Sequence, residues 1–335
     1  GLENNPSIDY ETNLYIENYL KENIHKRFVY NLKKQHSNWA GFVYHFTHLE
    51  NAIDIIKNRQ ILSRNKATKD GDFSDAAGDV VNRRHDAHDY ARFYFRPQTP
   101  TQFYNECLGK DYLSDKYDQA LNLGLPKCPI PVFFKFSIDE VFNNQFDKCY
   151  ISNGNLQTNW ARIGTVSEMY NLFDFNDVYS TIQSTSDGDW RTYINKSQQE
   201  FLVRDQFDFS AIHNYEILVR NRSDLFQLKH LLKDYPNVVQ KIRIADYDDD
   251  IYLNNNKEIE YNLEGNTVSV STNYNGNGSR SGYFEMEIEE GTYRINSGQV
   301  LSKTGNTIRF YPGINIEFES EPCLKVTFKD QVTNR

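Results

Sequence analysis

The chain has 335 residues, of which 39% are hydrophobic and 14% aromatic, and its formal net charge is −9. This length favours two domains, and the apolar content is sufficient for buried cores. The acidic balance excludes binding to nucleic acid through bulk charge, so such binding would need a local cationic patch. The sequence has no run of about 18 apolar residues and no signal-peptide pattern, so we expect no membrane contact and a cytoplasmic location.

The N-terminal region predicts a helix, a strand and a second helix. Residues 9–35 carry apolar side chains at mixed spacings of three and four, which is typical of a helix that caps a domain. Residues 43–48 predict the strand. Thr47 and Glu50 have the spacing of a capping box, so a helix should begin there and end near residue 59. The positive end of this helix dipole favours a ligand phosphate or amide oxygen at the end of the strand.

The predicted strand divides its side chains between two faces. Tyr44 and Phe46 take one face, whereas His45 and Thr47 share the other. His45 and His48 could also suggest a metal site, but no third ligand accompanies them, and the four cysteines form no Cys-x-x-Cys pair. We therefore expect a polar binding face without a metal.

A basic stretch follows the second predicted helix. Residues 57–69 contain three lysines and two arginines but no acid, and Arg83, Arg84, Arg92 and Arg96 come after them. Such a stretch is either a solvated basic face or a phosphate-binding surface. Its position beside the strand that carries His45 favours the second interpretation.

The rest of the first domain alternates predicted strands, helices and polar loops. Residues 65–89 predict a long loop or short helices, and residues 184–197 predict a polar loop. Asn153-Gly154 predicts a turn. The other predicted elements are strands at 132–137, 200–203, 215–219 and 241–245 and helices at 168–175 and 223–234.

The composition changes beyond residue 246. Runs of Asp and Asn within 248–256 indicate a linker, and we divide the chain into domains 1–248 and 249–335. The second domain alternates almost continuously, which predicts a small antiparallel sandwich or barrel of about six to eight strands. From residue 251 onward acidic residues outnumber basic ones, which favours a protein partner over a nucleic acid. The alternating runs lie at 257–263, 267–272, 283–288, 307–311, 314–318 and 324–328.

One carboxylate lies at the start of a predicted strand. Residues 197–203 pass from a polar run into an apolar strand and leave Glu200 where the strand begins. This side chain is either a solvent-facing strand end or an acid suited to sugar chemistry.

Four motifs follow one another in the first domain. They are a His-x-Thr-His strand leading into a helix, a pair of arginines, a Phe-Tyr-Phe-x-Pro segment followed by a second proline, and a Glu-Phe-Leu-Val strand, at residues 45–48, 83–84, 93–100 and 200–203. Together they resemble the DarT family of NAD-dependent ADP-ribosyltransferases, toxins that modify bases of single-stranded DNA. The resemblance spans roughly residues 40–220 and implies an ADP-ribosyltransferase-like split β-sheet core with flanking helices. With the C-terminal all-β domain that the alternating pattern predicts, the expected fold class is α+β.

The resemblance also implies a biological setting. It predicts a toxin of a toxin-antitoxin or phage-defence system, with NAD as the ADP-ribose donor and no metal. The acidic C-terminal domain would then bind an antitoxin or a regulatory protein.

The resemblance assigns catalytic roles to three residues. Glu200 corresponds to the family's catalytic carboxylate, near the ribose that becomes oxocarbenium-like when NAD loses nicotinamide. Arg83 and Arg84 correspond to a paired-arginine segment in which one arginine contacts a cofactor phosphate and helps to remove the proton of the acceptor base. The sequence leaves open which of the two has this role.

Five residues are assigned to the cofactor. His45, Phe46 and Thr47 correspond to the nicotinamide side, where the adjoining backbone holds the carboxamide and the ribose hydroxyls. Tyr94 and Phe95 either build the nicotinamide pocket or belong to the core beside it.

Five further residues are assigned to the acceptor substrate. Gln198 has the Gln-x-Glu form in which the upstream glutamine faces the acceptor, and Asn155 matches the last position of a family turn near the acceptor. Trp190 and Arg191 lie in the loop that selects the acceptor, where they suit base stacking and backbone contact. Trp190 would equally serve as an anchor for its own loop. Arg92 is assigned to the same side.

Two departures from the family pattern leave the acceptor open. Arg92 stands where the family usually has proline before the aromatic motif, and Gln98-Thr99 replaces Arg-Ser. A base in single-stranded DNA is preferred because a reacting base must be unstacked, but thymine and guanine both remain, and RNA is the alternative. A transferase that modifies protein side chains and a non-catalytic binding module are further alternatives.

Overall fold

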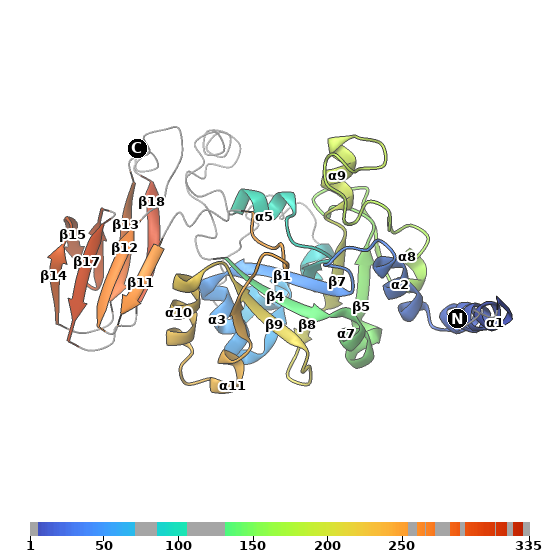
Figure 1. Cartoon of the computed structure of the whole chain (residues 1–335), viewed down its shortest axis with the longest axis horizontal. Helices are drawn as coiled ribbons and strands as arrows, with labels where there is room; N and C mark the ends of the chain where they lie inside the picture. The colour runs from blue at the N-terminus through green and yellow to red at the C-terminus, as the bar shows by residue number, and fades with distance from the viewer. Residues whose placement is uncertain are drawn as a thin grey trace, which may run out of the picture.

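The computed structural model describes residues 6–70, 86–105, 131–253, 260–264, 266–271, 282–288, 292–311, 313–319 and 324–330. In these residues a large mixed sheet with flanking helices is followed by two small antiparallel sheets (Figure 1). This arrangement confirms the α+β class. No helix in this part of the chain is long and apolar enough to cross a membrane.

The large sheet is split between two of its strands. Its order over the described residues is β10-β9-β4-β1-β3-β7-β5-β6, and only β10 and β9 run parallel to each other. Strand β1 pairs with β4 along its whole length but with β3 only at the register pair of Tyr44 and Tyr94. The sheet therefore has two halves that meet at this point, as an ADP-ribosyltransferase-like core requires. The strands are β1 (Phe42–His48), β3 (Tyr90–Tyr94), β4 (Pro131–Ser137), β5 (Cys149–Ser152), β6 (Ile163–Gly164), β7 (Glu200–Arg204), β9 (Tyr215–Val219) and β10 (Ile242–Ile244).

Helices cover both faces of this sheet. In Figure 1, α5 and α9 lie above it as drawn, and α3 and α7 lie below. A small ribbon of β2 (Gln60–Leu62) and β8 (Gln206–Asp208) lies beside it. The helices are α1 (Pro6–Glu22), α2 (Ile24–Lys33), α3 (Leu49–Asn58), α4 (Arg64–Asp70), α5 (Pro100–Asn105), α7 (Ile138–Gln145), α8 (Val166–Met169), α9 (Trp190–Lys196), α10 (Arg222–Leu231) and α11 (Pro236–Val239), with 3-10 turns η2 (Asp86–Asp89) and η3 (Phe146–Lys148).

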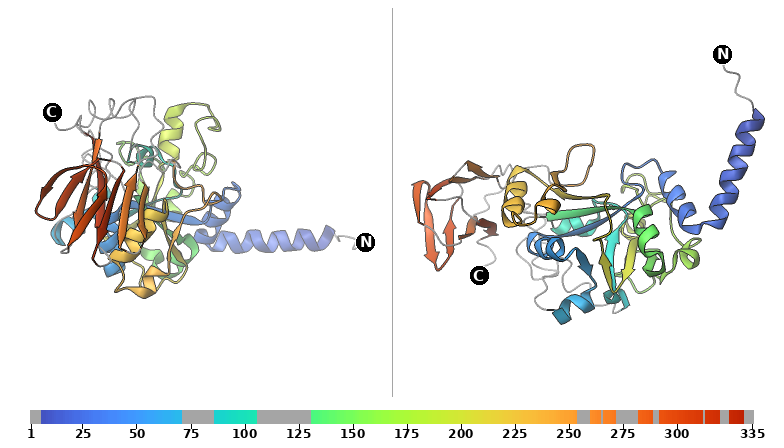
Figure 2. Two further views of the ribbon diagram at one scale, coloured as in Figure 1. Left: turned by 60° about the vertical axis from the view of Figure 1, so that its left-hand side comes forward. Right: turned by 90° about the horizontal axis from the view of Figure 1, so that it is seen from below.

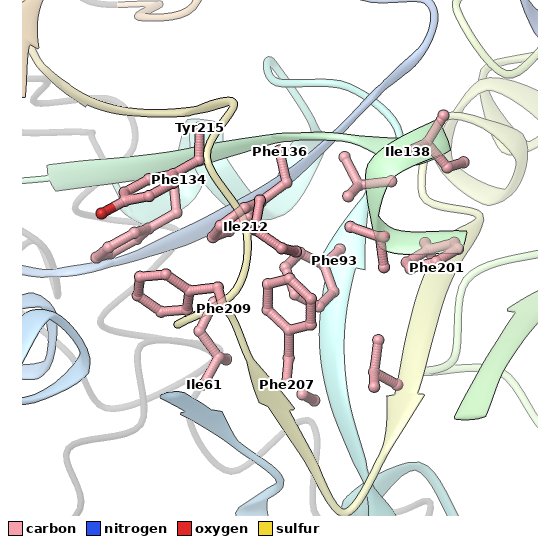
Figure 3. Close-up of a cluster of buried hydrophobic side chains, with 14 of the residues drawn as sticks. Ile61, Phe93, Phe134, Phe136, Ile138, Phe201, Phe207, Phe209, Ile212 and Tyr215 are labelled. Atoms are coloured by element: carbon pink, nitrogen blue, oxygen red, sulfur yellow. The ribbon is translucent and has the colours of Figure 1, made fainter. Parts of the chain in front are cut away.

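The core on one face of the sheet is rich in phenylalanine side chains (Figure 3). The ring centres of Phe93 and Phe207 lie 5.2 Å apart in an edge-to-face arrangement, which is a favourable geometry for aromatic pairs. Because alternate residues of a strand face opposite sides, β7 sends Phe201 into this core and Leu202 to the other face. The same alternation places Glu200 on the face of Leu202.

The N-terminal region differs from the expected single helix. It forms α1 and α2, and α1 extends away from the main sheet (Figure 2), leaving Tyr10 and Tyr15 exposed. Only α2 packs on the core, through buried residues such as Phe28. Helix α3 begins as predicted, but its N-cap is His48 rather than Thr47, because His48 Nδ1 accepts the backbone N–H of Glu50 at 3.3 Å.

Two other predictions need correction. The polar loop expected at 184–197 ends in helix α9, because the side chain of Asp189 accepts the backbone N–H of Arg191 and caps a helix there. The helix expected at 168–175 is the single turn α8, capped by Thr165.

The segment expected to be a linker lies against the main sheet in part. Ile251 and Tyr252 are buried, and the Tyr252 hydroxyl lies 2.8 Å from the carbonyl oxygen of Leu218, to which it donates. The Trp39 indole N–H donates to the carbonyl of Asp249 at 3.1 Å. The division of the chain at residues 248 and 249 stays a prediction.

The C-terminal strands form two four-stranded antiparallel sheets, ordered β11-β12-β17-β14 and β15-β16-β13-β18 over the described residues. One apolar cluster joins Val268 and Ile316 of the first sheet to Met286 and Phe310 of the second, so the sheets form the predicted sandwich. Two of its strands were not predicted, because most residues of β14 and β15 are exposed. The strands are β11 (Glu260–Glu264), β12 (Thr267–Ser271), β13 (Gly282–Ile288), β14 (Tyr293–Ser297), β15 (Val300–Thr304), β16 (Thr307–Phe310), β17 (Ile314–Phe318) and β18 (Leu324–Asp330).

Candidate active site

Glu200 is a buried carboxylate at the start of β7. The residue is 1% exposed, so it is not a solvent-facing strand end. Its backbone N–H donates to Ser152 Oγ at 2.8 Å, and this hydroxyl donates to the carbonyl oxygen of Gly154 at 2.9 Å. The turn after β5 thus fixes the backbone from which the carboxylate projects.

The carboxylate of Glu200 is held by Arg92 of β3. Arg92 Nε and one terminal nitrogen donate to the two oxygens of Glu200, each at 2.7 Å. Such a bidentate pair fixes both the position and the orientation of the carboxylate. Burying a carboxylate costs free energy unless a cation and hydrogen bonds compensate, and Arg92 provides both.

Tyr94 lies directly opposite Glu200 in the register of β3 and β7. Burial, reinforced by the charge of Glu200, raises the pKa of Tyr94, so it is a neutral phenol at pH 7. Phe95, the next residue, packs in the core against Phe28 and Phe201. Only Tyr94 of this predicted pair therefore lies beside the carboxylate.

Arg92 also connects the two halves of the split sheet. The carbonyl oxygen of Arg92 lies 2.8 Å from His45 Nδ1 on β1. Burial lowers the pKa of His45 to about 4, so the ring is neutral at pH 7. Since a carbonyl oxygen only accepts, Nδ1 carries the proton and Nε2 is left as an acceptor. One residue thus positions the histidine through its backbone and the glutamate through its side chain.

The structure places the other two β1 residues on opposite faces. Thr47 is buried, on the face of the strand that also carries His45. The ring of Phe46 faces the other way and lies 5.0 Å from that of Phe133. Phe46 shares its face with Tyr44, the register partner of Tyr94, whereas the His45 ring lies 5.8 Å from that of Phe93 in the core. The roles of His45, Phe46 and Thr47 at the cofactor stay predictions.

Gln198 links two helices beside the carboxylate. Its Oε1 accepts the hydroxyl of Thr101 at 2.6 Å, and its Nε2 donates to the carbonyl of Ile194 at 3.0 Å. The side chain thereby joins the start of α5 to α9. Its acceptor-facing role stays a prediction.

The residues predicted to face the acceptor lie at the start of α9 and in the loop after β5. Trp190 begins α9 and is 56% exposed, so it is not a buried anchor of its loop, and Arg191 lies 5.7 Å from its ring. Asn155 is buried, and its side-chain oxygen accepts the backbone N–H of Gln157 at 3.0 Å.

Another exposed aromatic residue, Trp160, was not predicted. It is 49% exposed, in the loop between β5 and β6, and Lys196 Nζ lies 5.1 Å from its ring. The only signal in the sequence is an aromatic residue in a polar segment shortly after the Asn153-Gly154 turn. Lys196 is distant in sequence, so the pair could not be anticipated.

Two predicted residues cannot be placed. Arg83 and Arg84 lie outside the described residues. Among the residues that are described, no group of three or more His, Cys, Asp or Glu side chains could hold a metal ion.

One sequence family matches more than half of the chain. Residues 44–253 match the sequence model of the DarT family, described as ssDNA thymidine ADP-ribosyltransferase. Among solved structures, Thermus sp. 2.9 DarT in complex with NAD+ is similar at 18% identity and a TM-score of 0.45, over 63% of this chain and 98% of that one. The same protein with ADP-ribosylated ssDNA is similar at 19% identity and a TM-score of 0.46, over 63% and 96%. Thermosipho africanus DarTG in complex with ADP-ribose gives 16% identity and a TM-score of 0.39, over 61% and 49%.

No curated protein matches the chain. The family match covers more than half of the chain, and it includes the whole site from His45 to Glu200. The chain therefore belongs to the DarT family of ssDNA thymidine ADP-ribosyltransferases.

Proposed function

We propose that this protein transfers ADP-ribose from NAD to a thymidine base of single-stranded DNA and releases nicotinamide. The observation that carries the proposal is the buried carboxylate of Glu200, held in a bidentate pair beside the split of the sheet. Membership of the DarT family indicates that the transferred group is ADP-ribose, and the description of that family names thymidine of single-stranded DNA as the acceptor.

The chemistry needs a fixed negative charge near the ribose. The bond between C1′ and the nicotinamide nitrogen breaks, its electron pair leaves with nicotinamide, and positive charge develops on the ribose. Glu200 would stabilise that charge, because a preorganised carboxylate needs little rearrangement as the charge forms. A base nitrogen then bonds to C1′ and loses its proton.

The remaining residues are divided between the side of the site that binds NAD and the side that binds the acceptor. His45 and Thr47, the backbone at Phe46, and Tyr94 would hold the nicotinamide end of NAD, with Phe95 supporting Tyr94 from the core. Arg83 or Arg84 would contact the cofactor phosphates, because a guanidinium donates two hydrogen bonds at once.

Acceptor binding would involve both loops near the start of β7. Trp190 and Arg191 would contact an extruded base and its backbone, Asn155 would shape the opposite wall, and Gln198 would keep α5 and α9 together. Arg92 would leave one oxygen of Glu200 when the substrates bind. Base-paired DNA would react poorly, since a paired base cannot enter such a site without being unstacked.

The modification would make the protein a toxin of a toxin-antitoxin or phage-defence system. A bulky ADP-ribose on a template base obstructs copying, so the activity would have to be restrained in its own cell. The acidic C-terminal domain would bind the antitoxin or another regulatory protein. We infer that the protein acts in the cytoplasm, where NAD and single-stranded DNA occur together.

The test uses NAD labelled in its ADP-ribose part. The full chain is incubated with separate pools of single-stranded DNA, duplex DNA, RNA and protein, and with oligonucleotides that contain or lack thymidine. We expect label on single-stranded DNA that contains thymidine and none with Glu200→Ala. Label on guanine-only DNA would change the base, label on RNA or protein would replace the acceptor class, and no label would favour a binding module.

A further inference from the structure

The loop that joins β5 to β6 carries an exposed indole in a fixed position. Leu156 and Ala161 of this loop are buried in a small cluster with Leu202, which lies two residues after Glu200 on the same face of β7. The loop ends are closed by hydrogen bonds between Asn153 and Arg162. Trp160 is 49% exposed on this otherwise anchored loop. A large apolar ring is thus presented to solvent by a rigid support.

A glycine makes the position of Trp160 possible. A Cβ atom at Gly154 would lie 2.6 Å from Cη2 of Trp160, which is closer than real contacts allow. The outer end of the indole therefore rests on Gly154, and a larger residue there would displace it. The carbonyl of Gly154 accepts a hydrogen bond from the Ser152 hydroxyl, and the same hydroxyl accepts the backbone N–H of Glu200. The residue that supports the indole is thus connected by hydrogen bonds to the start of β7.

A cation lies beside the ring. Lys196 Nζ donates to the carbonyl of Asn153 at 2.8 Å and lies 5.1 Å from the centre of the Trp160 ring. An aromatic ring next to a positive charge is the arrangement by which proteins hold single strands, with the ring stacking on a base and the cation facing a phosphate.

We propose that Trp160 and Lys196 bind a nucleobase and phosphate of single-stranded nucleic acid next to the target nucleotide. The proposal rests on the proposed function for the identity of the polymer. It adds the Trp160 ring of the β5–β6 loop, together with Lys196 at the end of α9, to the surface that Trp190 provides at the start of that helix. The ring is preorganised, so stacking requires no ordering of the loop.

The test measures binding and transfer separately. Fluorescence anisotropy of a labelled oligonucleotide with a single thymidine gives the Kd of the full chain, and label from NAD gives transfer. Trp160→Ala should raise the Kd for the oligonucleotide about tenfold, in line with the loss of one stacked base. Its Kd for NAD should stay within twofold of wild type. Trp160→Phe, which keeps a smaller ring, should lose less.

Two matched changes sharpen the test. Gly154→Ala should weaken oligonucleotide binding in the same direction, because the added Cβ displaces the indole while leaving it present. Tyr247→Ala removes another exposed ring, 93% exposed and just after β10 at the far edge of the sheet, and should have no effect. An abasic nucleotide beside the thymidine should weaken binding to wild type but cause little further loss with Trp160→Ala.

Equal oligonucleotide affinity of wild type and Trp160→Ala, or no binding by wild type, would overturn the inference. An abasic effect of the same size in both proteins would overturn it as well. Normal binding without transfer to DNA would instead contradict the proposed function and leave the stacking role supported.

Discussion

The two folded parts of the chain differ in what they bury. The part built on the main sheet encloses polar and charged side chains, among them Glu200, Arg96 and Asp224, whereas the described residues of the C-terminal sandwich enclose only apolar ones. Enclosing a charge costs free energy even when a partner is present. The sandwich shows that this chain can form a core without that cost. The buried charged side chains in the part built on the main sheet are therefore best explained by the neighbouring groups that they hold in position.

The largest effect should follow from removing Arg92. Arg92→Ala leaves the carboxylate of Glu200 buried without its counterion, so we expect at least about a hundredfold loss of transfer and about 3 kcal/mol lower stability. Arg92→Lys keeps the positive charge but cannot donate two parallel hydrogen bonds to Glu200. Its transfer rate and stability should lie between those of wild type and Arg92→Ala. Transfer rates at saturating NAD and urea unfolding measure both effects. Wild-type transfer by Arg92→Ala would show that the pair has no role in catalysis.

Truncation should locate the boundary between the two parts. Ending the chain after Asp248 removes Asp249, whose carboxylate accepts from Arg243 at 2.6 and 2.8 Å, together with the buried Tyr252. We expect the first part to lose about 3–5 kcal/mol of stability. Ending it after Leu253 should cost less than about 1 kcal/mol, because the buried segment remains. Equal stability of the two truncated proteins would contradict this role of the segment.

A substitution inside the sandwich should act locally. Ile316→Ala removes a fully buried side chain from its apolar cluster and should destabilise the sandwich by about 2–5 kcal/mol. The affinity for NAD, measured by calorimetry, should not change. A weaker affinity would mean that the two parts are energetically coupled.

His45 should give a smaller, pH-dependent effect. The pKa of His45 is about 4 in the folded protein and 6.5 without burial, so the unfolded state binds a proton more readily between these values. The stability due to neutral His45 is fully present above pH 6.5 and is lost as the pH falls toward 4, by at most about 3 kcal/mol.

His45→Gln should abolish this dependence, which urea unfolding at several pH values would show. Burial raises the pKa of Asp224 to about 6, and this carboxyl acts in the opposite direction in nearly the same range. The difference between variant and wild type therefore isolates the histidine. A difference that does not vary between pH 4 and 6.5 would disprove the assignment.

Local patterns in the sequence predicted much of the main sheet. The apolar runs that became β4, β7 and β9 are bounded by prolines or polar residues, and the position of Glu200 followed from the start of one of them. The faces of β1 followed from alternation alone. Helix α9 was missed because its residues lack an apolar period, and its beginning depends on the cap supplied by Asp189.

Contacts between distant residues could not be predicted in this way. Arg92 and Glu200 are 108 residues apart, and their pairing depends on the register of β3 and β7. Lys196 and Trp160 meet only because the fold brings α9 beside the β5–β6 loop. In the sandwich, β14 and β15 are too exposed to show the alternation that identified the other strands.

We propose that Glu200 supplies the charge that stabilises the ribose as nicotinamide leaves. The most direct measurement compares transfer by wild type and Glu200→Gln at saturating NAD, with the affinity for NAD determined in parallel. We predict that the variant binds NAD within a few-fold of wild type while its transfer rate falls at least about a hundredfold. A variant that binds NAD normally and transfers ADP-ribose at the wild-type rate would contradict the claim.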